Sequence, residues 1–369
     1  MGITISAIDL TKKFKETVAV QNLNFSVKEG ELFAFLGPPG AGKTTTLNLL
    51  AGILLPDEGD IKVGGKSILE LKPQERDFAM VFESYALYPH LTVEQNIAFP
   101  LMSPMRSNQY SKGEIKEKVL NTAKMLGIDE LLTRYPKELS GGQKQRVGVG
   151  RALIRDTELY LLDEPIAHLD AKLRHHMRGE LKRLQKKSGR TTILATPDYN
   201  EVVAMADRAA ILNNGEIQQI GTPLDLFNRP KNIITAASIG DPPINLFDFK
   251  LKTKDAKTNL VGDGFSIVVN EKLSYSLKRN SNDDSFVLGV RPGKIEVEND
   301  KNRALLSGEV YIFEPLGAQG ILTVKIGEKL VKLRTDTNDR YEIGKNVYLS
   351  FKLNDSTVFH KETGEAILM

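Results

Sequence analysis

The sequence predicts an α/β domain built around a mostly parallel sheet, with a helical insertion, followed by a smaller all-β domain. From Ile3 to about Asn232, strand-like apolar runs alternate with helical patterns. After Asn228–Lys231 the sequence pattern changes to short runs of alternating apolar residues, which glycine or Asn/Asp clusters separate. We therefore place the two domains at 1–232 and 233–369, with the helical subdomain at about 84–155.

Three runs in the first domain have the composition of buried parallel strands. They are the apolar or β-branched stretches Glu31–Leu36, Glu158–Leu162 and Thr191–Ala195, and unbroken runs of this kind are typical of strands covered on both faces. Between the last two, residues 171–187 have helical spacing and meet Gly189, a residue type that commonly ends a helix.

Short strands at even spacing fill the second domain. Residues with strand-like alternation are found at 265–269, 286–290, 310–312, 321–325 and 347–351. Short strands with turn residues between them predict a small closed or nearly closed β-barrel.

Composition limits the classes of function. The 369 residues include 50 Lys+Arg and 47 Asp+Glu, and the resulting net charge of +3 is too small to indicate nucleic-acid binding. There is no cysteine, which excludes disulfide and thiolate chemistry. No run approaches the roughly 20 apolar residues that cross a bilayer, and Met1–Thr4 does not begin a signal sequence. We expect a cytoplasmic protein that reaches a membrane only by docking to another protein.

One stretch matches the phosphate-binding pattern G-x-x-x-x-G-K-[ST] at every fixed position. It consists of Gly37, Pro38, Pro39, Gly40, Ala41, Gly42, Lys43 and Thr44, with Thr45 next. It follows a strand-like run and opens into a helical pattern, so a chance match in a Gly/Pro-rich turn is the less favoured interpretation. Backbone N–H groups and Lys43 would bind phosphates, and the Thr44 hydroxyl is a ligand type that suits Mg²⁺.

Two acids follow the strand-like run at 158–162. Asp163 is expected to hold Mg²⁺, directly or through water, and Glu164 to accept a proton from an attacking water. Two surface acids at a turn would be the simpler interpretation if they occurred in a chain without the phosphate loop.

A second helix start has the features of an anion site. Ser140 is a natural N-cap, and Gly141, Gly142 and Gln143 follow it into a helical run. One monomer uses both helix N-termini for phosphates only if these ends converge, so we expect one of the two to face a neighbouring molecule. A simple helix cap is the alternative.

Taken together, these segments and Leu169–Asp170 resemble the ATPase subunit of an ABC transporter. Further matches at 84–90, 239–245 and 289–292 resemble the branch that energises import of sugars, polyols and glycerol phosphate. The resemblance covers nearly the whole chain. It implies ATP and Mg²⁺ as ligands, a P-loop NTPase fold for the first domain, and an OB-like regulatory barrel for the second.

The resemblance also implies roles and partners. Phe14 would stack on adenine with Val18 beside it, although packing of Phe14 in the core is the alternative. Ser140–Gln143 would contact the ATP of a second ATPase subunit. Two membrane permease subunits would dock near Tyr85–His90, an extracytoplasmic solute-binding protein would take part indirectly, and the chain would lie peripherally at the cytoplasmic face of the membrane.

Two positions depart from the family pattern. Glu83 stands where the family has a glutamine that contacts Mg²⁺ and the attacking water, and Pro197 stands where it has a switch histidine. A glutamate still ligates Mg²⁺, but its charge opposes an anionic transition state. Proline offers no N–H donor, and loss of one oriented donor costs on the order of 3 kcal/mol, roughly a hundredfold in rate.

These departures lead to three hypotheses about function. The first is the slow half of a heterodimeric ATPase pair that drives an importer, in which Ser140–Gly142 serves the competent site of a different chain. The second is a slow homodimeric importer ATPase. The third is a nucleotide-binding regulatory module in which domain closure matters and hydrolysis does not, although Glu164 argues against complete loss of hydrolysis.

Overall fold

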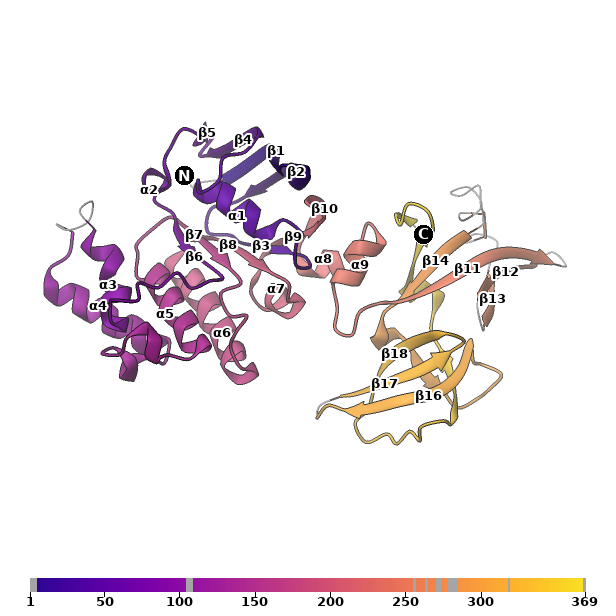
Figure 1. Ribbon diagram of the computed structural model, residues 1–369. Helices are drawn as coiled ribbons and strands as arrows, with labels where there is room; N and C mark the ends of the chain where they lie inside the picture. Colours follow the sequence, from indigo (N-terminus) through magenta and orange to yellow (C-terminus); the bar gives the residue numbers. More distant parts are fainter. Residues whose placement is uncertain are drawn as a thin grey trace. The chain divides into compact units, whose positions relative to one another are not determined.

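The computed structural model describes residues 5–103, 109–254, 257–262, 265–269, 274–275, 277, 285–317 and 319–367 (Figure 1). The chain divides into two compact units, of which the first ends at Leu224 and the second begins at Asp225. The boundary predicted after residue 232 therefore lies inside the second unit. Contacts with later strands hold residues 227–231 in the second unit. The guanidinium of Arg291 donates to the carbonyl of Phe227 at 2.9 Å and lies 4.2 Å from the centroid of its ring. Ala366 N–H donates to the carbonyl of Lys231 at 2.7 Å.

A six-stranded sheet forms the centre of the first unit, in the order β10-β9-β3-β8-β7-β6. Neighbouring strands are parallel except for β10, which is antiparallel to β9. The predicted, mostly parallel sheet is confirmed. The strands are β3 Leu32–Leu36, β6 Ala79–Val81, β7 Leu159–Asp163, β8 Thr191–Thr196, β9 Arg208–Asn213 and β10 Glu216–Gly221.

Alternating residues of the central strands face two different layers. One face, with Phe33, Phe35 and Ile193, shares a core with helix α1 (Lys43–Ala51) and with a second, antiparallel sheet of order β2-β1-β4-β5. The strands of that sheet are β1 Ile5–Phe14, β2 Thr17–Val27, β4 Glu58–Val63 and β5 Lys66–Ser67. Helix α1 is thus fixed between two sheets.

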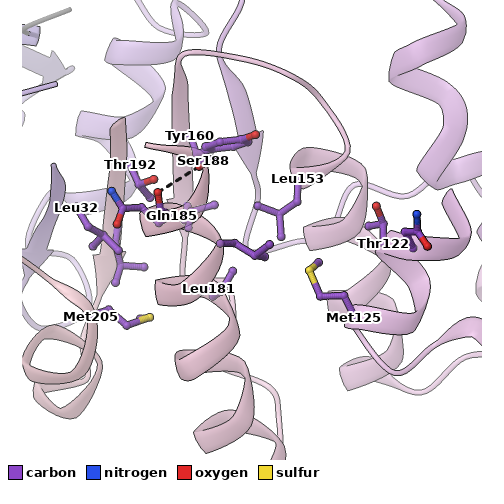
Figure 2. A pocket seen from close by; sticks show the side chains of 14 residues that line it. Leu32, Thr122, Met125, Leu153, Tyr160, Leu181, Gln185, Ser188, Thr192 and Met205 are labelled. Carbon is purple, nitrogen blue, oxygen red and sulfur yellow. Dashed lines mark hydrogen bonds between the residues drawn. The ribbon is translucent and has the colours of Figure 1, made fainter. Parts of the chain in front are cut away.

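The opposite face of the central sheet lies toward helices α6 (Ala171–Ser188) and α7 (Tyr199–Met205). Helix α6 ends at Gly189, which has φ 64°, and the helix predicted at 171–187 is confirmed. A cavity of about 270 Å³ lies on this side, and its lining includes Leu194. Figure 2 shows Leu32, Leu181 and Met125 around it. Its lining is largely aliphatic, and it includes no residue of the phosphate loop.

A helical segment leaves the sheet after β6 and returns before β7. It contains α3 (Val93–Ala98), α4 (Lys112–Met125) and α5 (Gly141–Leu153), which pack against one another. The short helix α2 (Pro73–Arg76) precedes β6. Within 84–155, the residues that the structure describes include no strand.

The second unit begins in the short helix α8 (Pro223–Asn228), continues through α9 (Ile233–Ser238) and is otherwise built from β-strands. One sheet has the order β13-β12-β11-β14-β20-β21 and the other β15-β19-β16-β17-β18. Their strands are β11 Asn245–Lys254, β12 Lys257–Gly262, β13 Phe265–Val269, β14 Ser285–Val290, β15 Glu296–Glu298, β16 Leu306–Pro315, β17 Gly320–Ile326, β18 Lys329–Thr335, β19 Asn346–Ser350, β20 Ser356–His360 and β21 Ala366–Ile367.

Both sheets contribute side chains to one apolar core, which includes Phe286, Leu288, Leu322 and Leu349. The unit therefore has the OB-like, all-β character that was predicted. The described strands make two sheets around this core, where the sequence suggested a single closed or nearly closed barrel. Among the described helices, none is both long and apolar enough to cross a membrane.

Candidate nucleotide site

In the loop between β3 and α1, two positions have room for glycine only. A Cβ atom on Gly37 would lie 2.1 Å from the carbonyl oxygen of Leu212, and one on Gly42 would lie 2.5 Å from that of Ala19. Gly42 also has φ 99°, in the left-handed region. The two glycines therefore let the loop run directly against neighbouring backbone.

The N-terminus of α1 is open. No side chain caps it, and the first intrahelical bond of the segment runs from Thr46 N–H to the carbonyl of Gly42. By helix geometry, the N–H groups of Lys43, Thr44 and Thr45 have no acceptor within the helix. Together with the positive end of the helix dipole they form a site suited to an anion.

Lys43 is 5% exposed and lies folded onto the loop. Its Nζ donates to the carbonyls of Gly37 at 2.8 Å and Pro38 at 2.9 Å, and lies 4.0 Å from Oε1 of Glu164. Burial lowers the pKa of Lys43, while the charges of Glu164, Asp163 and Glu83 act in the opposite direction. The ammonium is therefore placed beside the open helix end, within reach of a phosphate.

Thr44 and Asp163 bring two oxygen ligands together. The Thr44 hydroxyl donates to Oδ1 of Asp163 at 3.2 Å. Burial raises the pKa of Asp163 to about 6, and the charges of Glu164 and Glu83 contribute to the increase. A hydroxyl and a buried carboxylate fit Mg²⁺. In the part of the chain that the structure describes, no cluster of three His, Cys, Asp or Glu side chains could hold a metal, so phosphate and water would complete the coordination.

Glu164 occupies a strained backbone position. Its φ is 45°, its N–H donates to the carbonyl of Ala195 at 3.0 Å, and its carbonyl accepts from Nε2 of Gln145 at 2.9 Å. Burial raises the pKa of its carboxyl, against the opposing effect of Lys43. A carboxylate with a raised pKa near the phosphate end of the loop suits a general base.

The two residues that depart from the family pattern follow β6 and β8. Glu83 is exposed, yet its charge raises the pKa of both Asp163 and Glu164. Pro197 is exposed directly after Thr196, whose carbonyl accepts from Gly37 N–H at 3.4 Å. The position of Pro197 is therefore next to the phosphate loop, where the proline supplies no donor.

The second predicted anion site is a complete capping box at the start of α5. Ser140 Oγ accepts from Gln143 N–H at 3.3 Å, and Gln143 Oε1 accepts from Ser140 N–H at 2.9 Å. The Gln143 carbonyl oxygen is thus engaged within its own helix. A Cβ atom on Gly141 or Gly142 would have its nearest neighbours in Tyr85, His168 and Leu169, outside the phosphate loop.

Phe14 is the last residue of β1 and Val18 the second residue of β2, and they are 45% and 39% exposed. The interpretation of Phe14 as a core residue is therefore wrong. Lys12 Nζ lies 5.7 Å from the centroid of its ring. An exposed ring of this kind has a face that a base could stack on.

Sequence reasoning missed the residues that hold the segment Tyr85–His90. Arg151 of α5 donates to the carbonyls of Tyr85 at 3.3 Å and Ala86 at 2.6 Å, and its guanidinium lies 5.4 Å from the ring centroid of Tyr88. Asn96, fully buried, accepts from Tyr88 N–H at 2.9 Å and donates to its carbonyl at 3.1 Å. Neither residue belongs to a pattern that its spacing would reveal.

A groove of about 670 Å³ adjoins this segment. Phe82, Tyr88, Phe99 and Arg151 contribute to its lining, and the rings of Tyr88 and Phe99 lie 4.4 Å apart. The groove combines aromatic surface with arginine and acidic side chains, and aromatic residues and arginine are enriched in protein interfaces.

Comparisons with known proteins agree with this geometry. The model of the family described as "ABC transporter" matches residues 20–167, and that of the "TOBE domain" matches 288–359. The xylose/arabinose import ATP-binding protein XacJ of Haloferax volcanii is 40% identical, over 98% of this chain and 95% of the relative. The chain belongs to the ABC transporter family. Its first unit carries the ATPase fold and its second a TOBE domain.

Other relatives cover the chain equally well. The trehalose/maltose import ATP-binding protein MalK of Thermococcus litoralis is 38% identical, over 98% of this chain and 99% of the relative. The multiple sugar-binding transport ATP-binding protein MsmK of Streptococcus mutans is 37% identical over 95% of each. A solved dimeric structure of the ATP-binding cassette MJ0796, bound to ADP and Pi after hydrolysis, has a TM-score of 0.55 and 30% identity, and covers 59% of this chain and 98% of that one. This ABC-type subunit is accordingly an ATPase that binds ATP.

A buried acid lies four residues beyond Pro197. Glu201 of α7 is 3% exposed, and Oε2 has no hydrogen-bond partner among the described residues. Burial, foremost, raises its pKa to about 7, and the nearby charge of Asp198 adds to the increase. Folding therefore favours the protonated carboxyl over the carboxylate.

The sign of this shift makes the Glu201→Gln variant informative. Between pH 4.5 and 7, Glu201 keeps its proton in the folded state but loses it in the unfolded state, because folding raises its pKa from 4.5 to about 7. Over this range the free energy of unfolding of the wild type should fall relative to that of the variant by up to roughly 3 kcal/mol. We expect the difference to grow between pH 5 and 7 and to be constant above pH 7.5. Urea unfolding followed by circular dichroism measures it, and Glu117→Gln on exposed α4 is the control. A difference that does not vary with pH contradicts the assignment.

Proposed function

We propose that this chain is the ATPase subunit that energises import of a sugar, polyol, glycerol or glycerol-phosphate type of solute. The complete phosphate loop beside Asp163 and Glu164 is the observation that carries the proposal. Relatives of 37% to 40% identity along nearly the whole chain have names that describe sugar import, and this supports a solute of that class.

In the proposed reaction, Phe14 stacks on adenine with Val18 beside it, and the loop from Gly37 to Thr45 binds the phosphates. Lys43 turns from the loop carbonyls to the phosphate oxygens, because a phosphate offers it a stronger, charge-assisted bond. Thr44, Asp163 and Glu83 are the residues that would hold Mg²⁺, which neutralises phosphate charge when bound. Glu164 accepts the proton of the attacking water.

The proposed partners are those that the family resemblance implies, and two surfaces of the first unit support them. Two membrane permease subunits dock at the segment Tyr85–His90 and the aromatic groove beside it, which places the chain peripherally at the cytoplasmic face of the membrane. An extracytoplasmic solute-binding protein takes part indirectly. Arg151 joins this docking segment to α5, whose N-terminus Ser140–Gly142 would serve the ATP of a second ATPase subunit.

We further propose that the second ATPase subunit is a different chain. Glu83 adds negative charge to a site that already contains Asp163 and Glu164, and Pro197 supplies no donor, so this chain's own site should be slow. The element offered to a neighbour, in contrast, has its capping box intact. A slow homodimer is the second candidate, while the presence of Glu164 disfavours a module without hydrolysis.

The nucleotide site is tested by Lys43→Ala. Loss of the ammonium should abolish detectable ATP binding, since a charged partner of the phosphates is removed from a buried position. Isothermal titration of the full chain with Mg-ATP measures this, with Lys116→Ala on the exposed face of α4 as the control. Equal affinity of Lys43→Ala and wild type would show that the assignment is wrong.

The slow site is tested by restoring the family residues. The double variant Glu83→Gln, Pro197→His removes a charge and adds a donor, so we expect turnover to rise by about a hundredfold or more. Phosphate release by the purified chain measures the effect, and each single variant separates the two contributions. A wild type that already turns over at about 1–10³ per second, with no gain in the double variant, contradicts the proposal.

The heterodimer is tested by comparing two variants in the transporter. Ser140→Arg should block the competent site of the partner and stop transport, whereas Glu164→Gln should have a smaller effect because it disables a site that is already slow. Transport into reconstituted vesicles measures both. Equal loss, in a complex whose only ATPase chain is this one, would favour the homodimer, because a homodimer contains each change in both sites.

A further inference from the structure

The loop Ile166–Leu169, which follows the two acids of the site, is held from both sides by a buried glutamine and a half-buried arginine. Gln145 of α5 accepts from His168 N–H at 3.1 Å. Arg174 of α6 donates through one terminal nitrogen to the carbonyls of Ala167 at 3.1 Å and Leu169 at 3.0 Å. Because Gln145 also donates to the carbonyl of Glu164, these contacts fix the backbone of the general base together with the loop.

One turn further along α6, Arg178 holds the segment that contains Pro197. Its terminal nitrogen donates to Oδ2 of Asp198 at 2.6 Å. Asp198 in turn starts α7, because its Oδ1 accepts from Asn200 N–H at 2.8 Å, and its own N–H donates to Oγ1 of Thr196 at 3.0 Å. Residues four apart lie on the same side of a helix. One side of α6 therefore contacts both the loop Ile166–Leu169 and the segment Thr196–Asp198.

Three buried polar atoms remain unsatisfied where the two segments approach this side of α6. They are Nε of Arg174, Nε of Arg178 and Oε2 of Glu201, none of which has a hydrogen-bond partner in the described part of the chain. Glu201 interacts electrostatically with both arginines and with Asp198, and forms a hydrogen bond with Thr196. A buried unsatisfied group costs about 1–3 kcal/mol, so the groups that connect the two segments lie in a polar network that the hydrogen bonds within the described residues do not fully satisfy.

We propose that Arg174 and Arg178 are positioning residues that couple the loop Ile166–Leu169 to the segment Thr196–Asp198, so that displacement of either segment moves the other. Both segments border the phosphate end of the site. Only Pro165 separates Glu164 from the loop, and the carbonyl of Thr196 accepts from Gly37 N–H of the phosphate loop. A movement of the segment that contains Pro197 would therefore shift the loop next to the general base, Glu164.

This inference goes beyond the proposed function and does not require the heterodimer, because every contact lies within one chain. The alternative is that each arginine stabilises only the segment that it touches. The two possibilities differ in a measurable way: Arg178 and Asp198 make none of the hydrogen bonds that hold the loop. A local role would leave the loop unchanged when their ion pair is removed, whereas coupling would loosen it.

The experiment measures amide hydrogen exchange of the full chain with Mg-ATP, in peptides that cover residues 164–172 and 196–204. Asp198→Asn keeps an oxygen that can cap α7 but weakens the ion pair, and Arg178→Leu removes it entirely. Arg183→Leu is the matched control, because Arg183 lies on the same helix but pairs with Glu180 on its exposed side. Amides of β9 report on general loss of stability, which would also appear if a variant failed to fold.

Coupling predicts that Asp198→Asn and Arg178→Leu each increase exchange in residues 164–172 by on the order of threefold to tenfold, with β9 and the control unchanged. The double variant should exchange no faster than Arg178→Leu, since both changes remove one interaction, and Arg178→Lys should restore part of the protection. Exchange in 164–172 that equals the wild type in both single variants, while 196–204 changes, overturns the proposal. An additive double variant overturns it as well.

Discussion

The order of strands in the parallel sheet is the constraint on which the site depends. Parallel strands place their carboxyl ends at one edge, and β3, β8, β7 and β6 are neighbours in the sheet. Gly37, Pro197 and Glu83 follow β3, β8 and β6 within one or two residues, and Asp163 is the last residue of β7. Segments separated by more than a hundred residues in sequence thus meet at one edge, and the phosphate end of the candidate nucleotide site depends on that arrangement.

Electrostatics at this edge explains why the departures from the family pattern matter. Asp163 and Glu164 are adjacent to a single buried cation, Lys43, which forms its two hydrogen bonds with loop carbonyls. Negative charge therefore exceeds positive charge here. The pKa of Asp163 is raised mainly by burial, and the charges of Glu164 and Glu83 add to the increase. A glutamate at position 83 increases the imbalance, whereas an amide there would be neutral. The consequence falls on the charged transition state more than on binding of the nucleotide.

The sequence was sufficient to predict the strands β3, β7 and β8, the helix α6 with its glycine end, and the phosphate loop, because each depends on a local pattern. In the second unit it predicted β13, β14, β16, β17 and β19 but not the other strands. It also did not predict their division into two sheets, since pairing between distant strands has no local signal. The exposure of Phe14 needed the structure for the same reason. Gln145, Arg151, Arg174 and Glu201 escaped notice because their role is defined by distant carbonyls and side chains, and polar residues on a helix are ordinary when considered alone.

The missed residues share a physical property: each connects segments that bear function without itself lying where a phosphate would bind. Gln145 and Arg151 belong to α5, so one helix contacts the backbone of Glu164, the loop after it and the proposed docking segment. Arg174 and Arg178 do the same from α6. In a site assembled from loops at a sheet edge, the strands determine where each loop begins. Hydrogen bonds from neighbouring helices help to determine the conformation that the loop then adopts. In the coupling proposed above, the segment that contains Pro197 is connected through α6 to the loop that follows Glu164, because Arg178 and Arg174 lie one turn apart on that helix.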